Sequence, residues 1–397
     1  MPRNTIMNKV AIAGVGHAGC YRDAGMPMGP MAVRACKMAL DDAGLTTKDV
    51  DGFGTASGAG ARDISVVHGW NEVDCNYMIE ALGLPGVTWF TNDALGGVPG
   101  VGTVALAAIA VASGLCEVAM TCRVNWRPKS SGYGHVASNK SYGQNAFFDP
   151  YGYGVFPQKF SSWYQRYMHE YGVTREQLGT FVVQSRQNYL LGDKPGVAPK
   201  HAITMEDYLA ARWVAEPMCL LDHDFPCDGA AAVVVTTAER ARSLRQKPVY
   251  LRAISAGQGP RPDFVFWHDY TQMASHFAAK GLWEKAQMSP KDLDLAQVYD
   301  GFTPFIFYWM DALGIAKPSE VGEFVGSGAL APTGVLPTNL NGGQINEGRV
   351  HTMGHVIEAV QQLQHRTGKR QVKDAERAIV CGGGLAVACI LVLSNQR

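Results

Sequence analysis

The chain has 397 residues, which is enough for two domains that each bury a core of ordinary size. Hydrophobic residues make up 47% of it and charged residues 18%, a balance typical of a globular protein with a large buried fraction. Lys plus Arg and Asp plus Glu number 35 each, so the net charge gives no reason to expect nucleic acid or an anionic membrane as a general partner.

The nine cysteines are scattered without a CxxC pair, which favours reduced thiols. The first residues, 1–14, lack the charged head and apolar core of a secretion signal. We therefore expect a cytoplasmic protein.

Residues 10–14 form an apolar run that predicts a strand, and Gly14, Gly16 and Gly19 after it match the GxGxxG pattern of dinucleotide sites. A dinucleotide site needs a helix that begins directly after these glycines. The next residues are rich in glycine and proline, and the helix is predicted only over 31–43. We therefore interpret the glycines as a simple turn from strand to loop.

Residues 94–116 carry no charge, which satisfies the length rule for a membrane-spanning helix. The run opens with glycines and a proline, so only residues 103–113 are predicted to be helical. That helix is too short to span a bilayer, and its apolar faces favour a helix buried in the centre of a large protein.

A weak internal repeat relates residues 31–53 to residues 274–296 at a constant offset of 243. Each copy contains a helix followed by Lys-Asp-hydrophobic-Asp, which leads into a strand. The repeat predicts two related α/β halves, residues 1–245 and 246–397.

The first half carries a long insertion over about 123–217, which begins as a predicted structured loop over 123–158. Two amphipathic helices are predicted after it, over 160–171 and 175–189. The second is preceded by Thr174, with Gln177 three residues later as in a capping box. An insertion of this length inside a compact domain usually lines a pocket or forms an interface.

Tyr299 and Asp300 follow a predicted strand that begins at Leu295, and a glycine comes next. The C-terminal end of a strand is where α/β enzymes place their chemistry. The alternative is a structural tyrosine with Asp300 as N-cap of a helix that begins near residue 304, and the two interpretations are compatible.

His351, His355 and Glu358 have a spacing that would place them on one face of a helix, as a metal site requires. The alternative is an active-site or helix-packing histidine pair, with Glu358 orienting one ring. Gly342 and Gly343 precede them in a glycine-rich loop, which allows either a close backbone approach to a ligand or a tight turn.

Cys381, Gly382, Gly383 and Gly384 separate two apolar strands near the C-terminus. They predict either a bulge that presents backbone N–H groups to an oxyanion or a tight hairpin.

Several segments occur in an order that resembles the thiolase superfamily, and more narrowly its sterol-carrier-protein or lipid-transfer branch. The resemblance covers nearly the whole chain and implies an α/β thiolase fold, in which duplicated halves form a five-layered αβαβα sandwich, and a tight homodimer. Its most specific segments are residues 112–119, 220–229, 228–237 and 298–302.

One departure from the family pattern concerns the acyl-accepting cysteine before the central helix. Counting back from residues 112–114 places Gly97 at the family's cysteine position. A covalent acyl-enzyme needs an activated nucleophile, which glycine does not supply, so thiolysis through an acyl-enzyme is disfavoured.

The GHPxGxSG motif of thiolases is also replaced, by residues 348–355. This form resembles the cysteine-less aldolases that shorten steroid side chains. The resemblance implies release of a short acyl-CoA from a β-hydroxyacyl-CoA, and a small zinc-ribbon and OB-fold partner subunit in a heterotetramer. It also implies tyrosines as proton carriers: one maps onto Tyr299, whereas the position of the other holds Arg349.

The hypothesis is a carbon–carbon lyase with coenzyme A as part of its substrate and with no metal or covalently bound cofactor. Tyr299, aided by Asp300, is its acid/base, Arg349 supplies positive charge, and His351 and His355 are competing proton carriers. The substrate and oxyanion contacts are assigned to glycine backbone, namely Gly342, Gly343, Gly382 and Gly383.

Two alternatives remain open. The first is a thiolase or Claisen-type acyltransferase that uses an unexpected cysteine, such as Cys381 or Cys227. The second is a non-catalytic subunit that binds lipid or acyl-CoA.

Overall fold

The computed structural model describes residues 4, 6–56, 67, 69–127, 143–192, 196–261 and 264–397. In this part of the chain, nine strands form one hydrogen-bonded sheet in the order β3-β2-β4-β7-β1-β8-β11-β10-β9. Its strands are β1 (Val10–Tyr21), β2 (Gly52–Thr55), β3 (Trp89–Thr91), β4 (Val118–Asn125), β7 (Asp228–Thr237), β8 (Val249–Gln258), β9 (Leu295–Val298), β10 (Arg377–Gly383) and β11 (Val387–Ser394).

The strand order is duplicated about the short pairing of β1 with β8. The run β2-β4-β7-β1 corresponds to β9-β10-β11-β8, with one parallel pair followed by two antiparallel pairs in each run. The turn before β2 and the turn before β9 also correspond. Thr46 N–H donates to Asp49 at 2.9 Å in the first, and Ser289 N–H donates to Asp292 at 2.7 Å in the second. The internal repeat of the sequence is therefore a repeat of structure.

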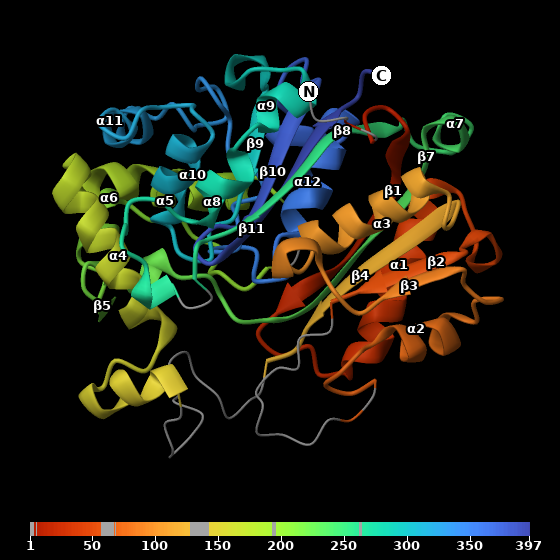
Figure 1. Cartoon of the computed structure of the whole chain (residues 1–397), viewed down its shortest axis with the longest axis horizontal. Helices are drawn as coiled ribbons and strands as arrows, with labels where there is room; N and C mark the ends of the chain where they lie inside the picture. The colour runs from red at the N-terminus through yellow and green to blue at the C-terminus, as the bar shows by residue number, and fades with distance from the viewer. Residues whose placement is uncertain are drawn as a thin grey trace.

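The helices form three layers that alternate with the two halves of the sheet (Figure 1). The central layer contains α3 (Val101–Ser113) and α12 (Met353–Leu363), which share one core with strands of both halves. On the outer face of the first half lie α1 (Met28–Ala43) and α2 (Cys75–Leu82). On the outer face of the second half lie α8 (Ala274–Ala279) and α10 (Phe305–Ala312). The five-layered αβαβα expectation is confirmed.

The apolar helix predicted over 103–113 is α3, and it begins two residues earlier than predicted, at Val101. Nine of its thirteen residues are buried between the two halves of the sheet, which explains why it carries no charge. No helix among the described residues is both long and apolar enough to cross a bilayer.

The turn predicted at the GxGxxG sequence is wrong, because β1 continues through it to Tyr21. Gly14 and Gly16 face α1, and a Cβ atom on either would lie within 2.3 Å of a carbonyl oxygen of that helix. The two glycines therefore let the helix pack directly on the strand. The helix itself begins at Met28 rather than at residue 31.

The insertion contains α4 (Phe156–Tyr171), α5 (Arg175–Leu190), α6 (Met205–Leu209) and a short hairpin of β5 (Trp213–Ala215) and β6 (Met218–Cys219). The capping box at Thr174 and Gln177 is confirmed, with hydrogen bonds of 3.3 and 2.9 Å in the two directions. Residues 128–142 of the predicted loop lie outside the described residues.

Aromatic contacts join the insertion to the second half of the chain. Phe160 stacks on Phe305 with ring centroids 4.6 Å apart, and Tyr167 lies 4.2 Å from Tyr308. Helix α4 is thereby fixed against α10, and its first residue, Phe156, lies at the candidate site.

Candidate active site

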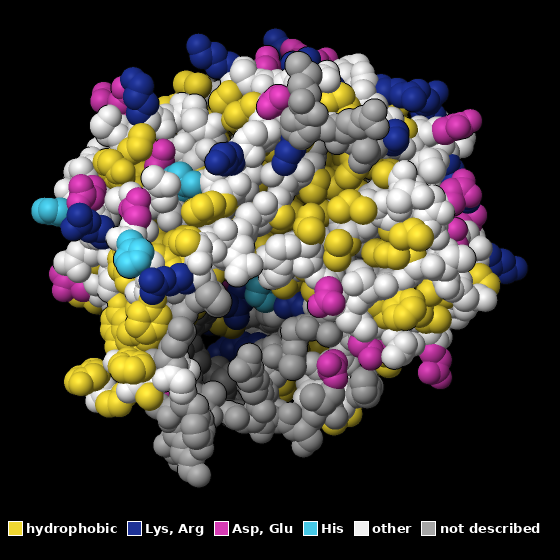
Figure 2. Space-filling view, in the orientation of Figure 1, with side chains coloured by type: hydrophobic (Ala, Val, Ile, Leu, Met, Phe, Trp, Pro, Cys, Tyr) yellow, Lys and Arg dark blue, Asp and Glu magenta, His cyan; other side chains and the backbone are white. Residues whose placement is uncertain are grey.

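A cavity of about 210 Å³ lies where the loop before α3 meets the ends of β9 and β10. Its walls are residues 97–99, the aromatic rings of Phe156, Phe302 and Phe305, the β10–β11 hairpin, and the side chains of Tyr299, His351 and Thr352. The molecule is hollowed below the centre of the face shown in Figure 2, with histidine and Lys/Arg side chains inside the hollow. A small, mostly apolar cavity with a few polar groups is the usual form of a site for a small reacting group.

Gly97, which the sequence resemblance places at the family's cysteine position, lies on the cavity wall. Its φ is +66°, and a Cβ atom built on it would have Val387 Cγ1 as its nearest neighbour, at 3.8 Å. The wall that would carry a nucleophile is therefore bare backbone.

Tyr299 follows the last residue of β9 and continues its pairing with β10, since its N–H donates to Cys381 O at 2.9 Å. The ring packs edge-on against Phe305, at a centroid distance of 5.5 Å. Burial and then the charge of Asp224 raise the pKa of the Tyr299 phenol, whereas the charge of Arg349 lowers it. The phenol is consequently protonated at neutral pH, and the phenolate that could act as a base is a minor species.

Asp300 and His355 form a buried pair that does not line the cavity. His355 Nε2 lies 3.4 Å from Asp300 Oδ1, and the same oxygen accepts the Gln344 N–H at 3.0 Å. The N-cap expected of Asp300 is wrong, because Pro304 occupies that position in α10. Asp300 therefore orients the loop that carries Gln344.

His351 and His355 do not share a helix face, because α12 begins at Met353 and His351 precedes it with a φ of +46°. Glu358 is directed elsewhere, to Arg370 at 2.9 Å. The side chains of His351, His355 and Glu358 are therefore not brought together as a metal site would require. Among the described residues, no group of three or more His, Cys, Asp and Glu side chains is placed to hold a metal ion.

His351 instead contacts Arg123, a residue near the end of β4 that sequence reasoning missed. Its Nδ1 lies 2.9 Å from Arg123 Nη2 and 3.3 Å from Arg123 Nε. Burial, followed by the charges of Arg123 and Arg349, holds the pKa of the His351 imidazole well below its usual range. His351 is therefore neutral at working pH.

Arg349 is partly exposed, and its Nε lies 3.8 Å from Oδ2 of the buried Asp224. Its backbone N–H donates to Phe225 O at 3.0 Å, which fixes the chain where it enters the site. Asp224 was also not identified from the sequence, because no sequence pattern distinguishes a buried aspartate in a loop from a solvent-exposed one.

The candidate glycines have different surroundings. Gly383 lines the cavity, whereas Gly382 faces Val98 and Val101 at the start of α3. Gly342 and Gly343 do not line the cavity: a Cβ atom on Gly342 would meet Tyr189, and one on Gly343 would lie 1.8 Å from Asp300 Oδ2. Their lack of a side chain makes room for protein groups.

Comparison with known proteins identifies the family. Residues 261–395 match a family model described as the thiolase C-terminal domain-like family. The chain is 31% identical over 395 residues to the 17-hydroxy-3-oxo-4-pregnene-20-carboxyl-CoA lyase of Mycobacterium tuberculosis, covering 95% of this chain and 97% of that protein. It is 30% identical over 405 residues to the steroid side-chain-cleaving aldolase of Thermomonospora curvata, covering 98% of each. The chain belongs to the thiolase superfamily.

Solved structures support the same assignment. The structure named Ltp2-ChsH2(DUF35) aldolase aligns with a TM-score of 0.87 and 28% identity, covering 99% of this chain and all of that chain. Human mitochondrial 3-ketoacyl-CoA thiolase aligns with a TM-score of 0.66 and 14% identity, which shows the fold alone. The branch is the sterol-carrier-protein type, together with the steroid side-chain aldolases.

The two cysteines proposed as alternative nucleophiles in this thiolase-superfamily member are buried and absent from the cavity wall. Burial raises the pKa of the Cys381 thiol well above its ordinary value. Cys227 Sγ donates to Arg349 O at 3.5 Å. Neither thiol has the exposure that is typical of a reactive cysteine.

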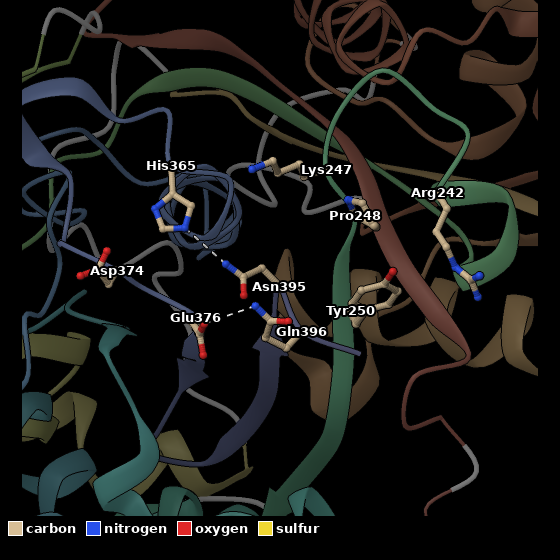
Figure 3. Close-up of a pocket in the computed structure, with 9 residues that line it drawn as sticks. All are labelled: Arg242, Lys247, Pro248, Tyr250, His365, Asp374, Glu376, Asn395 and Gln396. Atoms are coloured by element: carbon tan, nitrogen blue, oxygen red, sulfur yellow. Dashed lines mark hydrogen bonds between the residues drawn. The ribbon is translucent and has the colours of Figure 1, made fainter.

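A second cavity of about 500 Å³ lies beside the first residues of β8 and the last residues of the chain (Figure 3). Its lining mixes cations (Arg242, Lys247) with acids (Asp374, Glu376), and none of its residues lines the first cavity. Of the two cavities, only the smaller one is lined by residues predicted to take part in catalysis, Tyr299 and His351.

Proposed function

We propose that this protein cleaves a β-hydroxyacyl-CoA with a bulky, steroid-like substituent by a retro-aldol reaction. The products are a ketone or aldehyde and a short acyl-CoA, and no covalent acyl-enzyme forms. The observation that carries the proposal is that the bare backbone of Gly97 and the side chain of Tyr299 line one cavity. The similarity to a carboxyl-CoA lyase and to a side-chain-cleaving aldolase over nearly the whole chain supports it.

Retro-aldol cleavage requires removal of the β-hydroxyl proton, breakage of the carbon–carbon bond to give a thioester enolate, and protonation of its α-carbon. Among the described residues on the cavity wall, only Tyr299 and His351 carry titratable side chains. Since Nδ1 of His351 is engaged by Arg123, we assign the proton transfers to Tyr299. Tyr299 first releases its phenol proton to solvent, which leaves the phenolate as a minor species at neutral pH. The phenolate takes the hydroxyl proton, and the phenol formed then protonates the enolate carbon.

Positive charge near the cavity favours the enolate. Arg349 and buried Arg123 both act electrostatically on His351, and Arg349 also acts on Tyr299. Fixed cations in a site shielded from water stabilise developing negative charge without reorganising. We propose no metal and no covalently bound cofactor, because proton transfer and fixed charge are sufficient for this reaction.

The assembly proposed is a homodimer that binds a small zinc-ribbon and OB-fold subunit, giving a heterotetramer in the cytoplasm. Strand β3 is at the edge of the sheet, and Phe90 on it is 60% exposed. Ile109 on α3 and Leu115 after it are also exposed. An exposed apolar edge strand is a surface that pairing would cover. The second subunit is supported by the related structure, whose name includes ChsH2(DUF35).

The test is incubation of the protein, with its small partner subunit, with a β-hydroxyacyl-CoA of a steroid-like side chain. Formation of a ketone or aldehyde together with a short acyl-CoA supports the aldolase, and intact-mass spectra during turnover then show unmodified protein. Cleavage that requires added CoA, or an acyl adduct on any cysteine, would establish the acyltransferase instead. Binding without turnover would establish a lipid or acyl-CoA carrier.

A further inference from the structure

Arg123 is a buried cation beside the candidate site. It lies on β4 with 3% of its surface exposed, and its Nη1 donates to the carbonyl oxygen of Ala56. Within the described part of the chain it forms no salt bridge with a carboxylate. Its Nη2 and Nε atoms lie 2.9 Å and 3.3 Å from Nδ1 of His351.

This contact determines the protonation state of the imidazole. Burial and the charge of Arg349 lower the pKa of Arg123 to about 10, so the guanidinium is still a cation at neutral pH and has donors only. Nδ1 of His351 must therefore present its lone pair, which in a neutral ring puts the proton on Nε2. An imidazolium would direct an N–H group at two N–H donors, so protonation breaks the contact.

The backbone holds His351 in this position. His351 and Thr352 both have positive φ, at +46° and +66°, which is rare for residues other than glycine, and rarest for a β-branched one. Thr352 N–H donates to Gln344 Oε1 at 3.1 Å, and Thr352 Oγ1 donates to Pro99 O at 3.2 Å. Such conformations persist where the surroundings over-determine them, and they cluster at functional sites.

The charged groups that act on His351 come from two elements: Arg123 from β4 and Arg349 from the loop of His351 itself. The Tyr299 phenol lines the same cavity from the end of β9. No carboxylate is among the causes of the lowered pKa of His351, and Asp224 lies 3.8 Å from Nε of Arg349.

We infer that Arg123 is a positioning residue that fixes His351 as the neutral Nε2–H tautomer, so that the imidazole serves as a hydrogen-bond donor to the substrate's thioester oxygen and not as a proton carrier. The identity of the acceptor rests on the proposed function. The tautomer does not, because it follows from the contact in the free protein.

The first test is therefore made without substrate. Nitrogen-15 NMR of ¹⁵N-histidine-labelled protein, with His351 assigned by its loss in His351→Gln, reports which ring nitrogen carries the proton. We expect wild-type His351 to be protonated on Nε2 and not to titrate between about pH 5 and pH 8, the range in which an ordinary histidine does. Protonation on Nδ1, or titration in that range, would overturn the inference whatever the enzyme's activity.

The second test uses Arg123→Met, which keeps the length and packing of the side chain, and Arg123→Lys, which keeps a charged donor. In Arg123→Met we expect the pKa of His351 to rise from its wild-type value, because one of the two cations that lower it is gone, although burial and Arg349 still hold it below that of an ordinary histidine. We expect kcat to fall about 10- to 100-fold with KM nearly unchanged, because a transition-state donor is no longer fixed. Arg123→Lys should recover much of kcat. A variant in which kcat and the pH profile stay as in the wild type would contradict the role of Arg123.

Two controls separate positioning from charge and from folding. Arg349→Met removes a nearby cation but leaves the contact with Nδ1, so the tautomer should be unchanged. In a His351→Gln background, Arg123→Met should produce no new ionisation, because the titrating ring is gone. A new ionisation in that background would assign the pH effect to another group and reject the inference. If Arg123→Met does not fold, the wild-type NMR measurement still decides.

Discussion

Replacing a tyrosine by phenylalanine at two positions, Tyr299 and Tyr308, can distinguish an effect on catalysis from an effect on stability. Among the described residues the Tyr299 hydroxyl has no protein hydrogen-bond partner, and its ring is held by Phe305. The hydroxyl of Tyr308 on α10 is fully buried and donates to the carbonyl oxygens of Trp163 and Tyr270, at 2.8 and 3.0 Å. The two tyrosines therefore form a matched pair for the same substitution.

Tyr299→Phe retains the ring contact and loses no hydrogen bond, so we expect the free energy of unfolding to change by less than about 0.5 kcal/mol. The loss of the proposed acid/base should lower kcat by at least about 100-fold, equivalent to about 2.7 kcal/mol of transition-state stabilisation. Tyr308→Phe removes the hydroxyl hydrogen shared by the carbonyl oxygens of Trp163 and Tyr270, which should cost about 1 kcal/mol of stability and leave kcat within about threefold.

The assay is cleavage of a β-hydroxyacyl-CoA followed by release of the short acyl-CoA, with equilibrium unfolding in urea measured on the same preparations. The reasoning requires opposite outcomes in the two variants. Tyr299→Phe with activity within a few-fold of wild type would remove Tyr299 from the mechanism. Tyr299→Phe that loses stability as Tyr308→Phe does would show that its hydroxyl has a structural partner.

Three further results are expected. Because burial and Asp224 raise the pKa of Tyr299, the phenolate is a minor species at neutral pH, and kcat should rise about tenfold per pH unit from about pH 6 to pH 8; a flat profile would reject a tyrosine base. Gly343→Ala should lower the free energy of unfolding in urea by about 3 kcal/mol or more, because the added methyl group displaces Asp300. Gly368 also has a positive φ but no atom near its Cβ position, so Gly368→Ala should cost only about 1 kcal/mol, and equal costs would contradict the packing role of Gly343. Cys381→Ala should keep kcat within about threefold, and a loss above about 100-fold would restore a thiol mechanism.

Features carried by local chemistry were predictable from the sequence. The two Lys-Asp-hydrophobic-Asp segments were predicted to lead into strands, and they precede β2 and β9. In each, the structure adds a hydrogen bond from a hydroxyl residue to the aspartate three positions later. Tyr299 was placed at the end of a strand because an apolar run stopped there, and the structure puts it on the cavity wall. Gly97 was located by counting back from residues 112–114, which resemble a segment of the thiolase superfamily, and the structure puts it on the same cavity wall.

Features that depend on contacts across the fold were not predictable. Arg123 and His351 are 228 residues apart, and no spacing rule relates them. The histidine pattern indicated one helix face, but the left-handed backbone at His351 and Thr352 moved the first histidine off the helix. The glycines of β1 matched a turn motif because a glycine required by a packed helix and a glycine required by a turn look alike in sequence.

The backbone before α3, and not only the side chain at residue 97, is unsuited to a cysteine. Gly96, Gly97 and Gly100 all have positive φ, a conformation that costs other residues about 1–2 kcal/mol each. A Cβ atom on Gly100 would lie 2.1 Å from the carbonyl oxygen of His351, so the segment before α3 packs directly on the segment that carries the imidazole. A cysteine at residue 97 would therefore start from a strained conformation, and its neighbouring histidine already has Nδ1 bonded to an arginine. The segment before α3 thus excludes a cysteine side chain without strain and also packs against the segment that carries His351. Replacing Gly97 by cysteine would therefore not be sufficient to create the active site of a thiolase.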